Sequence, residues 1–264
     1  MRNGIGLQMA RKLIKICLLS LLVSFSVLVA SLTDLLLQDR KRKLFYLSRI
    51  TSLFSKALLK ILGVRVYVKN LENSVKSDNN HLIVSNHLSY IDIFVISSVI
   101  PSIFVASIDE VRDKFLLGRM AKLGGSIFVD RRSRARLSEE IDTISELLKD
   151  GLSVVLFPEG TTSNGDGVLS FKAPFLTPAI KTKTAILPVC LRYRGINGEG
   201  VNPDNRDFVF YYGDMDFFGH FVELLSLSSI DVELIGLENI RVDSGISRKE
   251  VTKLAFDFIK LAYH

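Results

Sequence analysis

The sequence predicts an α/β fold in which a mainly parallel central sheet is flanked by helices. Apolar runs of strand length alternate along the chain with longer segments of helical periodicity, which is the order that parallel sheets require. Several apolar runs end abruptly in polar residues or glycine, as strands do where they leave a sheet. The 264 residues suffice for one medium-sized domain and an appendage. We therefore expect the sheet domain in residues 63–264 and a membrane-associated helical segment in residues 1–62.

Periodicity and stop signals predict the individual elements. The alternation of Val64, Val66 and Val68 with polar neighbours is typical of a half-exposed strand, and Gly151 ends a strongly periodic helix. Pro188 lies inside an apolar run, which indicates an edge strand or a bend. Strands are expected at residues 64–69, 82–84, 103–106, 127–129, 154–157, 185–191 and 231–235. Helices are expected at residues 92–99, 111–122, 138–149 and 248–262.

Residues 16–33 form an uncharged apolar stretch. As a helix this stretch spans about 27 Å, slightly less than the roughly 30 Å hydrocarbon core of a bilayer. Basic residues flank it on both sides, so the positive-inside rule gives no clean orientation. They are Arg2, Arg11, Lys12 and Lys15 before it, and Arg40, Lys41, Arg42 and Lys43 after it. Basic flanks also suit a helix that dips into one leaflet with its ends among anionic head groups.

The next segment, residues 44–62, is predicted to be an amphipathic helix that ends at Gly63. Its apolar stripe comprises Leu47, Ile50, Phe54, Ala57, Leu58 and Ile61, and its polar face comprises Arg49, Ser52, Ser55, Lys56 and Lys60. A hydrophobic helix followed directly by a basic amphipathic helix predicts a two-helix segment that seats the protein on a membrane. Two alternatives stay open: the first helix could be a cleaved signal peptide, and the second a core-facing helix of the globular domain.

Charge and composition narrow the function classes. The formal net charge is +6 and the mean hydropathy is +0.29. A basic chain suits nucleic acid, an anionic membrane surface or a phosphorylated substrate. The sequence has no zinc-ligand spacing, aromatic RNA-binding motif or basic repeat, so we expect no nucleic-acid partner and no metal site. Cys17 and Cys190 lie in apolar contexts and are predicted to be packed thiols rather than a disulfide.

The strongest candidate for catalysis lies where the second predicted strand ends. An apolar run leads to His87, and Asp92 follows at the start of a predicted helix. An imidazole can accept a proton from a hydroxyl near neutral pH, and a carboxylate can fix its tautomer and stabilise the imidazolium. The spacing therefore predicts a general base with its orienting partner. The alternative is that Asp92 only completes a capping box with Ser89 as the helix cap, and that His87 is an ordinary loop residue.

A basic cluster follows the strand predicted at residues 127–129. Arg131 comes directly after this strand, on the sheet edge where His87 is expected, because the carboxyl ends of parallel strands share one edge. A guanidinium there can hold a phosphate through paired hydrogen bonds. Further arginines within residues 132–136 leave a solvated basic turn as the alternative.

Another abrupt strand end occurs at Pro158, which stops the pairing of the preceding strand. Gly160 allows a ligand or backbone to approach closely, and Glu159 can accept hydrogen bonds from a substrate hydroxyl or orient a neighbouring cation. Lys172, further along, is a candidate phosphate contact. A bare turn without function is the alternative interpretation of this segment.

Four blocks of the sequence match the motifs of one enzyme family, in the order that the family has them. They are Asn86-His87-Leu88-Ser89-Tyr90-Ile91-Asp92, Ile127-Phe128-Val129-Asp130-Arg131, Phe157-Pro158-Glu159-Gly160-Thr161 and Ile186-Leu187-Pro188-Val189. From about Gly63 to its end, the chain resembles the glycerolipid acyltransferases, of which bacterial lysophosphatidic acid acyltransferase is the familiar member. The two-helix N-terminus also resembles the membrane-seating motif of that family.

The resemblance implies a role for each matching residue. His87 would act as the general base and Asp92 would orient it. Arg131 would contact the phosphate or head group of the acceptor. The residues implied in positioning the acceptor are Glu159, Gly160, Thr161 and Lys172.

The implied reaction is the attack of a lysolipid hydroxyl on an acyl thioester, without a covalent enzyme intermediate and without a cofactor. The donor would be acyl-CoA or acyl-carrier protein. The first acceptor expected is 1-acylglycerol-3-phosphate, which gives phosphatidate in phospholipid biosynthesis. Such an enzyme is expected in the bacterial inner membrane, in contact with membrane lipids, with its catalytic domain facing the cytoplasm.

Two departures from the family pattern leave the acceptor head group open. Thr162 stands where the family often has arginine, and Ser107 stands where many relatives carry lysine. Similar relatives acylate other lysolipids, including lyso-ornithine lipid. A non-catalytic lipid-binding membrane protein with the same fold is a further alternative. So is an exported hydrolase, although the chain lacks the Gly-x-Ser-x-Gly elbow of such enzymes.

Overall fold

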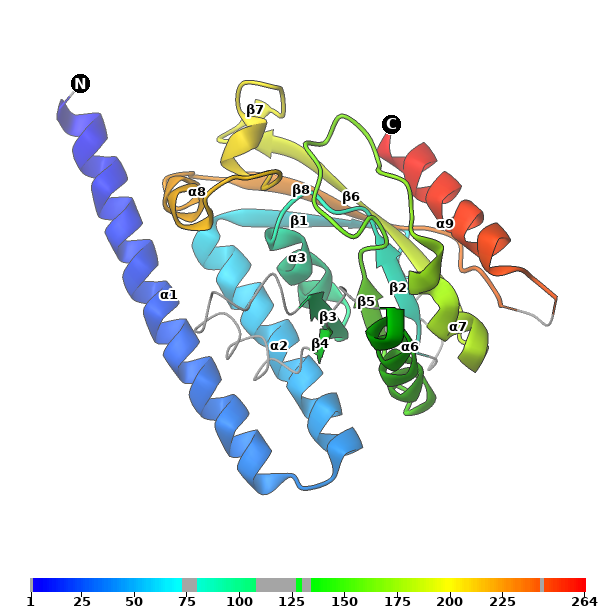
Figure 1. Cartoon of the computed structure of the whole chain (residues 1–264). Coiled ribbons are helices and arrows are strands. Elements are labelled where there is room, and N and C mark those ends of the chain that lie inside the picture. The colour runs from blue at the N-terminus through cyan, green and yellow to red at the C-terminus, as the bar shows by residue number, and fades with distance from the viewer. Residues whose placement is uncertain (1, 73–79, 108–126, 130–133, 243–244) are drawn as a thin grey trace.

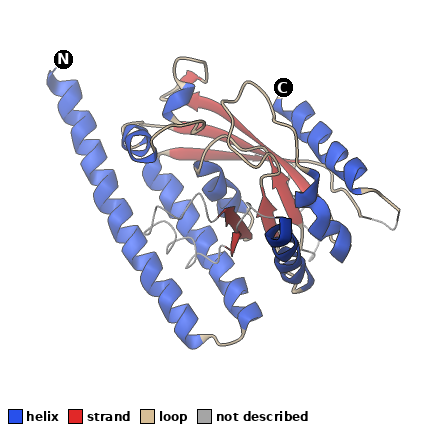
Figure 2. Cartoon of the chain, in the orientation of Figure 1, coloured by secondary structure: helices blue, strands red, loops and turns tan. Residues whose placement is uncertain are grey.

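The computed structural model describes residues 2–72, 80–107, 127–129, 134–242 and 245–264 (Figure 1). The helix predicted at residues 111–122 and the candidate site residue Arg131 lie outside these ranges. The described residues form one eight-stranded sheet with helices on both of its faces (Figure 2). The α/β fold predicted from the sequence is confirmed.

The strands follow the order β1-β8-β6-β2-β5-β3-β4 across the sheet, and β7 pairs with β6. They are β1 (Val64–Lys69), β2 (Leu82–Ser85), β3 (Ile103–Ser107), β4 (Ile127–Val129), β5 (Val154–Leu156), β6 (Ile186–Ile196), β7 (Glu199–Gly200) and β8 (Ile230–Gly236). Neighbouring strands are parallel, except that β6 runs antiparallel to both β7 and β8. Every strand predicted from the sequence occurs, and the sheet is mainly parallel as expected.

Strand β6 changes its pairing partner along its length. It pairs with β2 over residues 186–189 and with β8 over residues 189–196. The sequence context of Pro188 indicated an edge strand or a bend. Pro188 lies inside the sheet, so the edge strand is wrong. Its carbonyl accepts a hydrogen bond from the Leu237 amide at 3.0 Å, but proline has no N–H with which to return one. The regular ladder between β6 and β8 accordingly ends at Gly236.

Helices cover both faces of the sheet. They are α1 (Arg2–Leu36), α2 (Arg40–Leu62), α3 (Ile91–Val99), α6 (Arg134–Lys149), α7 (Thr177–Thr182), α8 (Phe217–Leu224) and α9 (Arg248–Tyr263), with 3₁₀ turns η1 (Ala173–Leu176) and η2 (Arg206–Phe208). α2, α3 and α8 contribute to the core on one face, and α6, α7 and α9 to the core on the other (Figure 1). α7 and α8 were not predicted, because helices of six and eight residues carry too little periodic signal.

α1 and α2 form an antiparallel hairpin at the N-terminus (Figure 1). Asp39 caps the start of α2 by accepting a hydrogen bond from the Arg42 amide at 2.7 Å, and Gly63 ends the helix at a φ of 85°. Among the described helices, the segment Gln8–Leu36 of α1 is the one that is long and apolar enough to cross a membrane. Its large apolar side chains are mostly exposed. The apolar N-terminal helix is therefore confirmed, whereas its insertion into a membrane stays a prediction.

The buried face of α2 differs from the predicted apolar stripe. Its buried residues are Leu47, Ser48, Ser52, Ser55, Leu59 and Leu62. Ser52 and Ser55 were predicted on the polar face and are buried instead. Small side chains allow neighbouring helices to approach closely, and α2 packs against both α1 and α3. The core-facing alternative therefore describes part of this helix. The division of the chain between residues 62 and 63 stays a prediction.

Lys15 attaches α1 to the globular part of the molecule. Its ammonium group donates hydrogen bonds to the carbonyls of Leu62 and Leu227, both at 2.7 Å, and the residue is only 7% exposed. The carbonyls at the end of a helix have no partner within that helix, so a buried cation is well placed beside them. Of the basic residues that flank the apolar stretch, Lys15 is thus directed toward the globular part of the protein.

The two cysteines differ in their surroundings. Cys190 is free and buried in β6, as predicted, whereas Cys17 is free and exposed on α1. The prediction of a packed thiol is wrong for Cys17, because the apolar residues around it on α1 are themselves exposed.

Replacing Lys15 with methionine removes the ammonium group and keeps a long apolar side chain. The carbonyls of Leu62 and Leu227 then lose their donor in a buried setting, so we expect the free energy of unfolding to fall by about 1–3 kcal/mol. Thermal unfolding of the detergent-solubilised protein measures this change. Lys12→Met on the same helix is the matched control, and equal stability of the two variants would contradict the attachment of α1 through Lys15.

Candidate active site

The candidate site lies where two neighbouring parallel strands end. β2 leads directly into Asn86 and His87, and β5 leads directly into Phe157. Because both strands run in the same direction, the loops that follow them meet at one edge of the sheet. The Ser163 amide donates a hydrogen bond to the His87 carbonyl at 2.9 Å, which joins the two loops.

His87 and Asp92 are in direct contact. Nδ1 of His87 lies 2.9 Å from Oδ2 of Asp92, and the two side chains are 15% and 0% exposed. An ionised carboxylate only accepts hydrogen bonds, so Nδ1 carries the hydrogen and Nε2 presents the free lone pair. The arrangement leaves one imidazole nitrogen available to accept a proton from another molecule.

The Asp92 carboxylate accepts hydrogen bonds from three further groups. Oδ2 accepts from the Leu88 amide at 2.6 Å and from the Ser89 amide at 2.9 Å, and Oδ1 accepts from the Tyr193 hydroxyl at 2.7 Å. Burial raises the pKa of Tyr193 well above its ordinary value, so this hydroxyl stays protonated and donates. Tyr193 was not among the predicted site residues, because the apolar run of this strand ends at residue 191.

The capping box predicted around Ser89 is only half present. α3 begins at Ile91, and its N-cap residue is Tyr90, which makes no side-chain capping bond. Ser89 is therefore not the cap residue, and its hydroxyl oxygen lies 3.5 Å from the Ile91 amide. The carboxylate half is formed, since Asp92 accepts from the Ser89 amide. The same carboxylate thus supports the helix start and contacts His87, so the two interpretations of Asp92 describe one arrangement.

Phe157 and Asn86 position the loop that carries His87. The imidazole stacks on the Phe157 ring with a centroid distance of 3.8 Å and an interplanar angle of 11°. The buried Asn86 amide group exchanges two hydrogen bonds with the backbone of Leu191, at 2.8 and 3.0 Å. This pair ties the end of β2 to β6. Asn86 and Phe157 belong to the motif blocks of the sequence, but no role was predicted for either residue.

Residues near α8 support the same loop from another side. The Tyr211 amide donates to the Leu88 carbonyl at 3.0 Å. His220 contacts the Phe210 carbonyl through Nε2 and the Tyr90 hydroxyl through Nδ1, both at 3.0 Å. Since a carbonyl only accepts, Nε2 carries the hydrogen and Tyr90 donates to Nδ1. Burial lowers the pKa of His220, which favours this neutral form. These contacts were not predicted from the sequence, because α8 itself was not predicted.

Glu159 is a buried carboxyl group close to the pair. Oε1 lies 3.4 Å from the His87 amide, which donates to it, and Oε2 makes no hydrogen bond with a described residue. Burial, with a smaller contribution from nearby Asp92, raises the pKa of Glu159 to about 8. The group is therefore largely neutral at pH 7 and can donate a hydrogen bond as well as accept one.

The other predicted site residues lie in or beside the loop after β5. Gly160 has a φ of 72°, and a Cβ at this position would lie 2.6 Å from Nζ of Lys172, so the lysine side chain crosses the glycine. The Lys172 amide donates to the Pro158 carbonyl at 2.9 Å. Thr161 is exposed in the same loop. The structure therefore brings Glu159, Gly160 and Lys172 to the edge of the sheet that carries His87.

The described site offers a proton-accepting imidazole, a buried carboxyl group and an ammonium group within one edge of the sheet. Among the described residues, no group of three or more His, Cys, Asp or Glu side chains could hold a metal ion.

Comparisons with known proteins identify the family. The family model described as Acyltransferase matches residues 65–192, the region that contains His87, Asp92 and Glu159. The lyso-ornithine lipid O-acyltransferase of Rhizobium meliloti (strain 1021) is 32% identical over 201 residues, which cover 74% of this chain and 68% of that protein. The chain belongs to the glycerolipid acyltransferase family.

This acyltransferase is similar to further enzymes of two kinds. The lyso-ornithine lipid O-acyltransferase of Brucella abortus (strain 2308) is 30% identical over 78% of both chains. The 1-acyl-sn-glycerol-3-phosphate acyltransferase of Neisseria gonorrhoeae is 38% identical over 46% of this chain and 47% of that enzyme. The crystal structure of the 1-acyl-sn-glycerophosphate (LPA) acyltransferase PlsC from Thermotoga maritima has the same fold. It aligns with a TM-score of 0.70 at 23% identity and covers 98% of this acyltransferase and 96% of that chain.

The pKa of Glu159 predicts a pH-dependent stability. Its value of about 8 in the folded protein exceeds the ordinary value of 4.5, so folding retains a proton that the unfolded chain releases between these values. The stabilising contribution is complete below pH 4.5 and is lost as the pH rises through 8. We expect the Tm of the wild type to fall between pH 5 and 9 more steeply than that of Glu159→Gln. Parallel Tm curves would show that Glu159 is ionised throughout.

Proposed function

We propose that this acyltransferase moves a fatty acyl group from an acyl thioester to the hydroxyl group of a lysolipid at the membrane surface. The observation that carries the proposal is the contact between His87 and Asp92, in which a fully buried carboxylate fixes the imidazole with Nδ1 protonated. An imidazole in this form is suited to deprotonate a hydroxyl group near neutral pH.

In the proposed reaction, Nε2 of His87 accepts the proton of the lysolipid hydroxyl while the oxygen attacks the thioester carbonyl. A tetrahedral oxyanion forms and collapses, the carbon–sulfur bond breaks, and the departing thiolate receives the proton from His87. The negative charge of Asp92 stabilises the imidazolium between these steps. Since the lipid oxygen is itself the nucleophile, no acyl-enzyme intermediate and no cofactor are needed, and the buried Cys190 has no part in the reaction.

We assign acceptor binding to the loop after β5. Glu159 is close enough to the catalytic loop to hydrogen-bond a substrate hydroxyl, and Lys172 supplies a positive charge beside Gly160. Gly160 lets the Lys172 side chain lie against the backbone of this loop, and we assign the exposed Thr161 beside it to the same head-group site. We also assign Arg131 to acceptor binding, because its sequence block matches the family motif. Its guanidinium would bind the acceptor phosphate.

Specific observations favour two acceptors. The match of four motif blocks and the similarity to 1-acyl-sn-glycerol-3-phosphate acyltransferases favour 1-acylglycerol-3-phosphate. Thr162 and Ser107, together with longer matches to lyso-ornithine lipid O-acyltransferases, favour lyso-ornithine lipid. Ornithine carries no phosphate, so a head group built on it requires fewer cations than a phosphate dianion.

We also propose that α1 anchors the enzyme in the inner membrane, with the catalytic domain in the cytoplasm. The exposed apolar side chains of α1 support the anchoring. The cytoplasmic location of the catalytic domain is proposed because the acyl thioester donors are cytoplasmic molecules. Cell fractionation combined with protease protection of the C-terminus tests both statements, and a C-terminus cleaved from outside intact spheroplasts would contradict the second.

Substitutions at the catalytic pair test the reaction. We expect His87→Ala to lower kcat by about 10²–10⁴-fold, because the general base is lost, and Asp92→Asn to cause a comparable loss, because the tautomer is no longer fixed. The assay follows transfer of a labelled acyl group to a lysolipid by the purified protein in detergent. Lysolipid binding without turnover by the wild type would instead support a non-catalytic lipid-binding protein, and full activity of His87→Ala would refute the mechanism.

An acceptor panel decides the head group. Rates are compared for 1-acylglycerol-3-phosphate, lyso-ornithine lipid, lysophosphatidylcholine and lysophosphatidylethanolamine. If Thr162 marks the head-group site, Thr162→Arg adds a guanidinium, and we expect the preference for 1-acylglycerol-3-phosphate over lyso-ornithine lipid to rise about tenfold. Thr162→Gln is the uncharged control of similar reach. An equal change in both variants would remove Thr162 from the head-group site.

A further inference from the structure

The Tyr193 side chain reaches Asp92 from β6 and binds the carboxylate oxygen that His87 does not contact. Its hydroxyl donates to Oδ1 at 2.7 Å, whereas Nδ1 of His87 and two backbone amides contact Oδ2. Among the described residues, Tyr193 is the one donor to Oδ1. Asp92 is fully buried, so water cannot replace this hydroxyl without a change in packing. One half of the catalytic carboxylate therefore depends on Tyr193.

β6 is irregular directly after Tyr193. Its register against β8 shifts between Tyr193 and Gly195. Such an irregularity bends a strand and changes the direction of the side chains beside it, and it is frequent next to active sites. The Tyr193 ring also meets the Phe210 ring edge to face, with a centroid distance of 5.4 Å and an interplanar angle of 67°. The strand and the ring contact together hold the hydroxyl in place.

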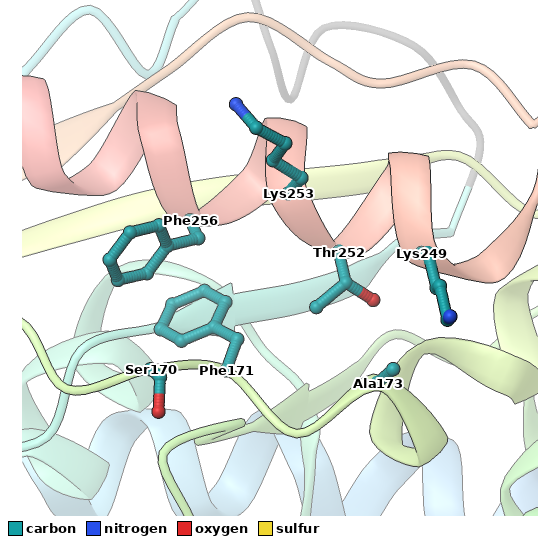
Figure 3. A pocket seen from close by; sticks show the side chains of 7 residues that line it. All are labelled: Ser170, Phe171, Ala173, Lys249, Thr252, Lys253 and Phe256. Carbon is teal, nitrogen blue, oxygen red and sulfur yellow. The ribbon is translucent and has the colours of Figure 1, made fainter.

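Tyr193 belongs to the closed core on the α3 side of the sheet. The residue is only 7% exposed. The open pocket along α9, where the Phe171 and Phe256 rings lie beside each other, is on the other face of the sheet (Figure 3). Tyr193 is therefore placed to act through Asp92 and not on a substrate.

The strength of the hydrogen bond from Tyr193 depends on the charge of His87. When the imidazole is neutral, the negative charge of Asp92 is uncompensated and the carboxylate is a strong acceptor. When the imidazole has accepted a proton, the imidazolium neutralises part of this charge and the hydrogen bond weakens. The hydroxyl thus favours the neutral imidazole over the imidazolium. Burial raises the pKa of Tyr193 well above its ordinary value, so the hydroxyl keeps its proton throughout.

We propose that Tyr193 is a positioning residue of the acyl transfer: its hydroxyl holds Asp92 with Oδ2 toward His87 and limits how tightly His87 retains the proton that it accepts. Both effects serve the reaction. The imidazole must be oriented when it takes the proton from the lysolipid hydroxyl, and it must release this proton to the departing thiolate. This inference rests on the proposed function, because it assigns a further residue to the same reaction.

Tyr193→Phe tests the proposal, because it removes the hydroxyl and keeps the ring. We expect kcat to fall about tenfold, equivalent to about 1.4 kcal/mol, because the imidazole is less well oriented, while the KM values of both substrates stay unchanged. The acidic limb of the pH profile of kcat/KM should move to higher pH, because the imidazole then holds its proton more tightly.

Tyr67→Phe is the matched control. The Tyr67 hydroxyl also donates to an aspartate, Asp231, at 3.3 Å, but this pair lies in β1 and β8 and Tyr67 is exposed. We expect Tyr67→Phe to keep the kcat and the pH profile of the wild type. The same kcat and the same acidic limb in Tyr193→Phe and Tyr67→Phe would overturn the proposal.

A stronger donor at position 193 should have the opposite effect on the pH profile. 3-Fluorotyrosine has a more acidic hydroxyl and therefore forms a stronger hydrogen bond with a carboxylate. Its incorporation in place of Tyr193 should move the acidic limb to lower pH and keep kcat closer to that of the wild type than Tyr193→Phe does. This variant also carries the test if Tyr193→Phe does not fold. A shift to higher pH would indicate a packing defect and overturn the proposal.

Other titratable groups lie close to this contact. They are Tyr90 at the start of α3, Glu159 in the loop after β5 and Tyr263 in α9. Burial raises the pKa of Tyr90 and Tyr263, so both stay protonated near neutral pH. Glu159 has a pKa of about 8 and can titrate in the same range as His87. The protonation of His87 is therefore also measured in the Glu159→Gln background.

NMR titration of labelled imidazole rings separates this inference from the proposed function, because it requires no turnover. The full-length chain in detergent has four histidines, and His87→Ala identifies the His87 signals. We expect these signals to titrate at higher pH in Tyr193→Phe than in the wild type or Tyr67→Phe. If no lysolipid is acylated but this difference is found, the proposed function fails and the control of His87 by Tyr193 stands. If acyl transfer is intact and the curves coincide, the assignment of Tyr193 fails alone.

Discussion

A fully buried carboxylate organises the centre of this acyltransferase. Asp92 accepts hydrogen bonds from His87, from the Leu88 and Ser89 amides and from the Tyr193 hydroxyl. A charge removed from water is costly unless hydrogen bonds replace its hydration. The start of α3, the loop after β2 and the middle of β6 must therefore keep their relative positions for Asp92 to stay satisfied. The same requirement orients the imidazole, so stability and chemistry depend on one group.

The parallel arrangement of the sheet supplies the second constraint. β2 and β5 are neighbours and end at the same edge, which brings the loop of His87 beside the loop of Glu159. β6 pairs first with β2 and then with β8, and Asn86 bonds to Leu191 where β6 continues beyond the end of β2. The extension of β6 past its neighbour is what allows Tyr193 to reach Asp92.

Different helices cover the two faces of the sheet. The hairpin of α1 and α2 lies on one side, where Lys15 attaches it to the carbonyls of Leu62 and Leu227. The helices α6, α7 and α9 pack on the other side.

The sequence by itself determined the features that depend on residues close together in the chain. The strand and helix periods, the apolar N-terminal helix and the His87–Asp92 spacing are local, and they predicted the α/β fold, most element positions and the catalytic candidates. Only the tertiary structure decided which distant groups meet. Tyr193 lies 101 residues from Asp92 and Leu227 lies 212 residues from Lys15. The serines of α2 are buried because neighbouring helices pack on them, and Glu159 holds its proton because the fold excludes water around it. Burial and long-range contacts arise from the packing of complete elements, and no local pattern encodes them.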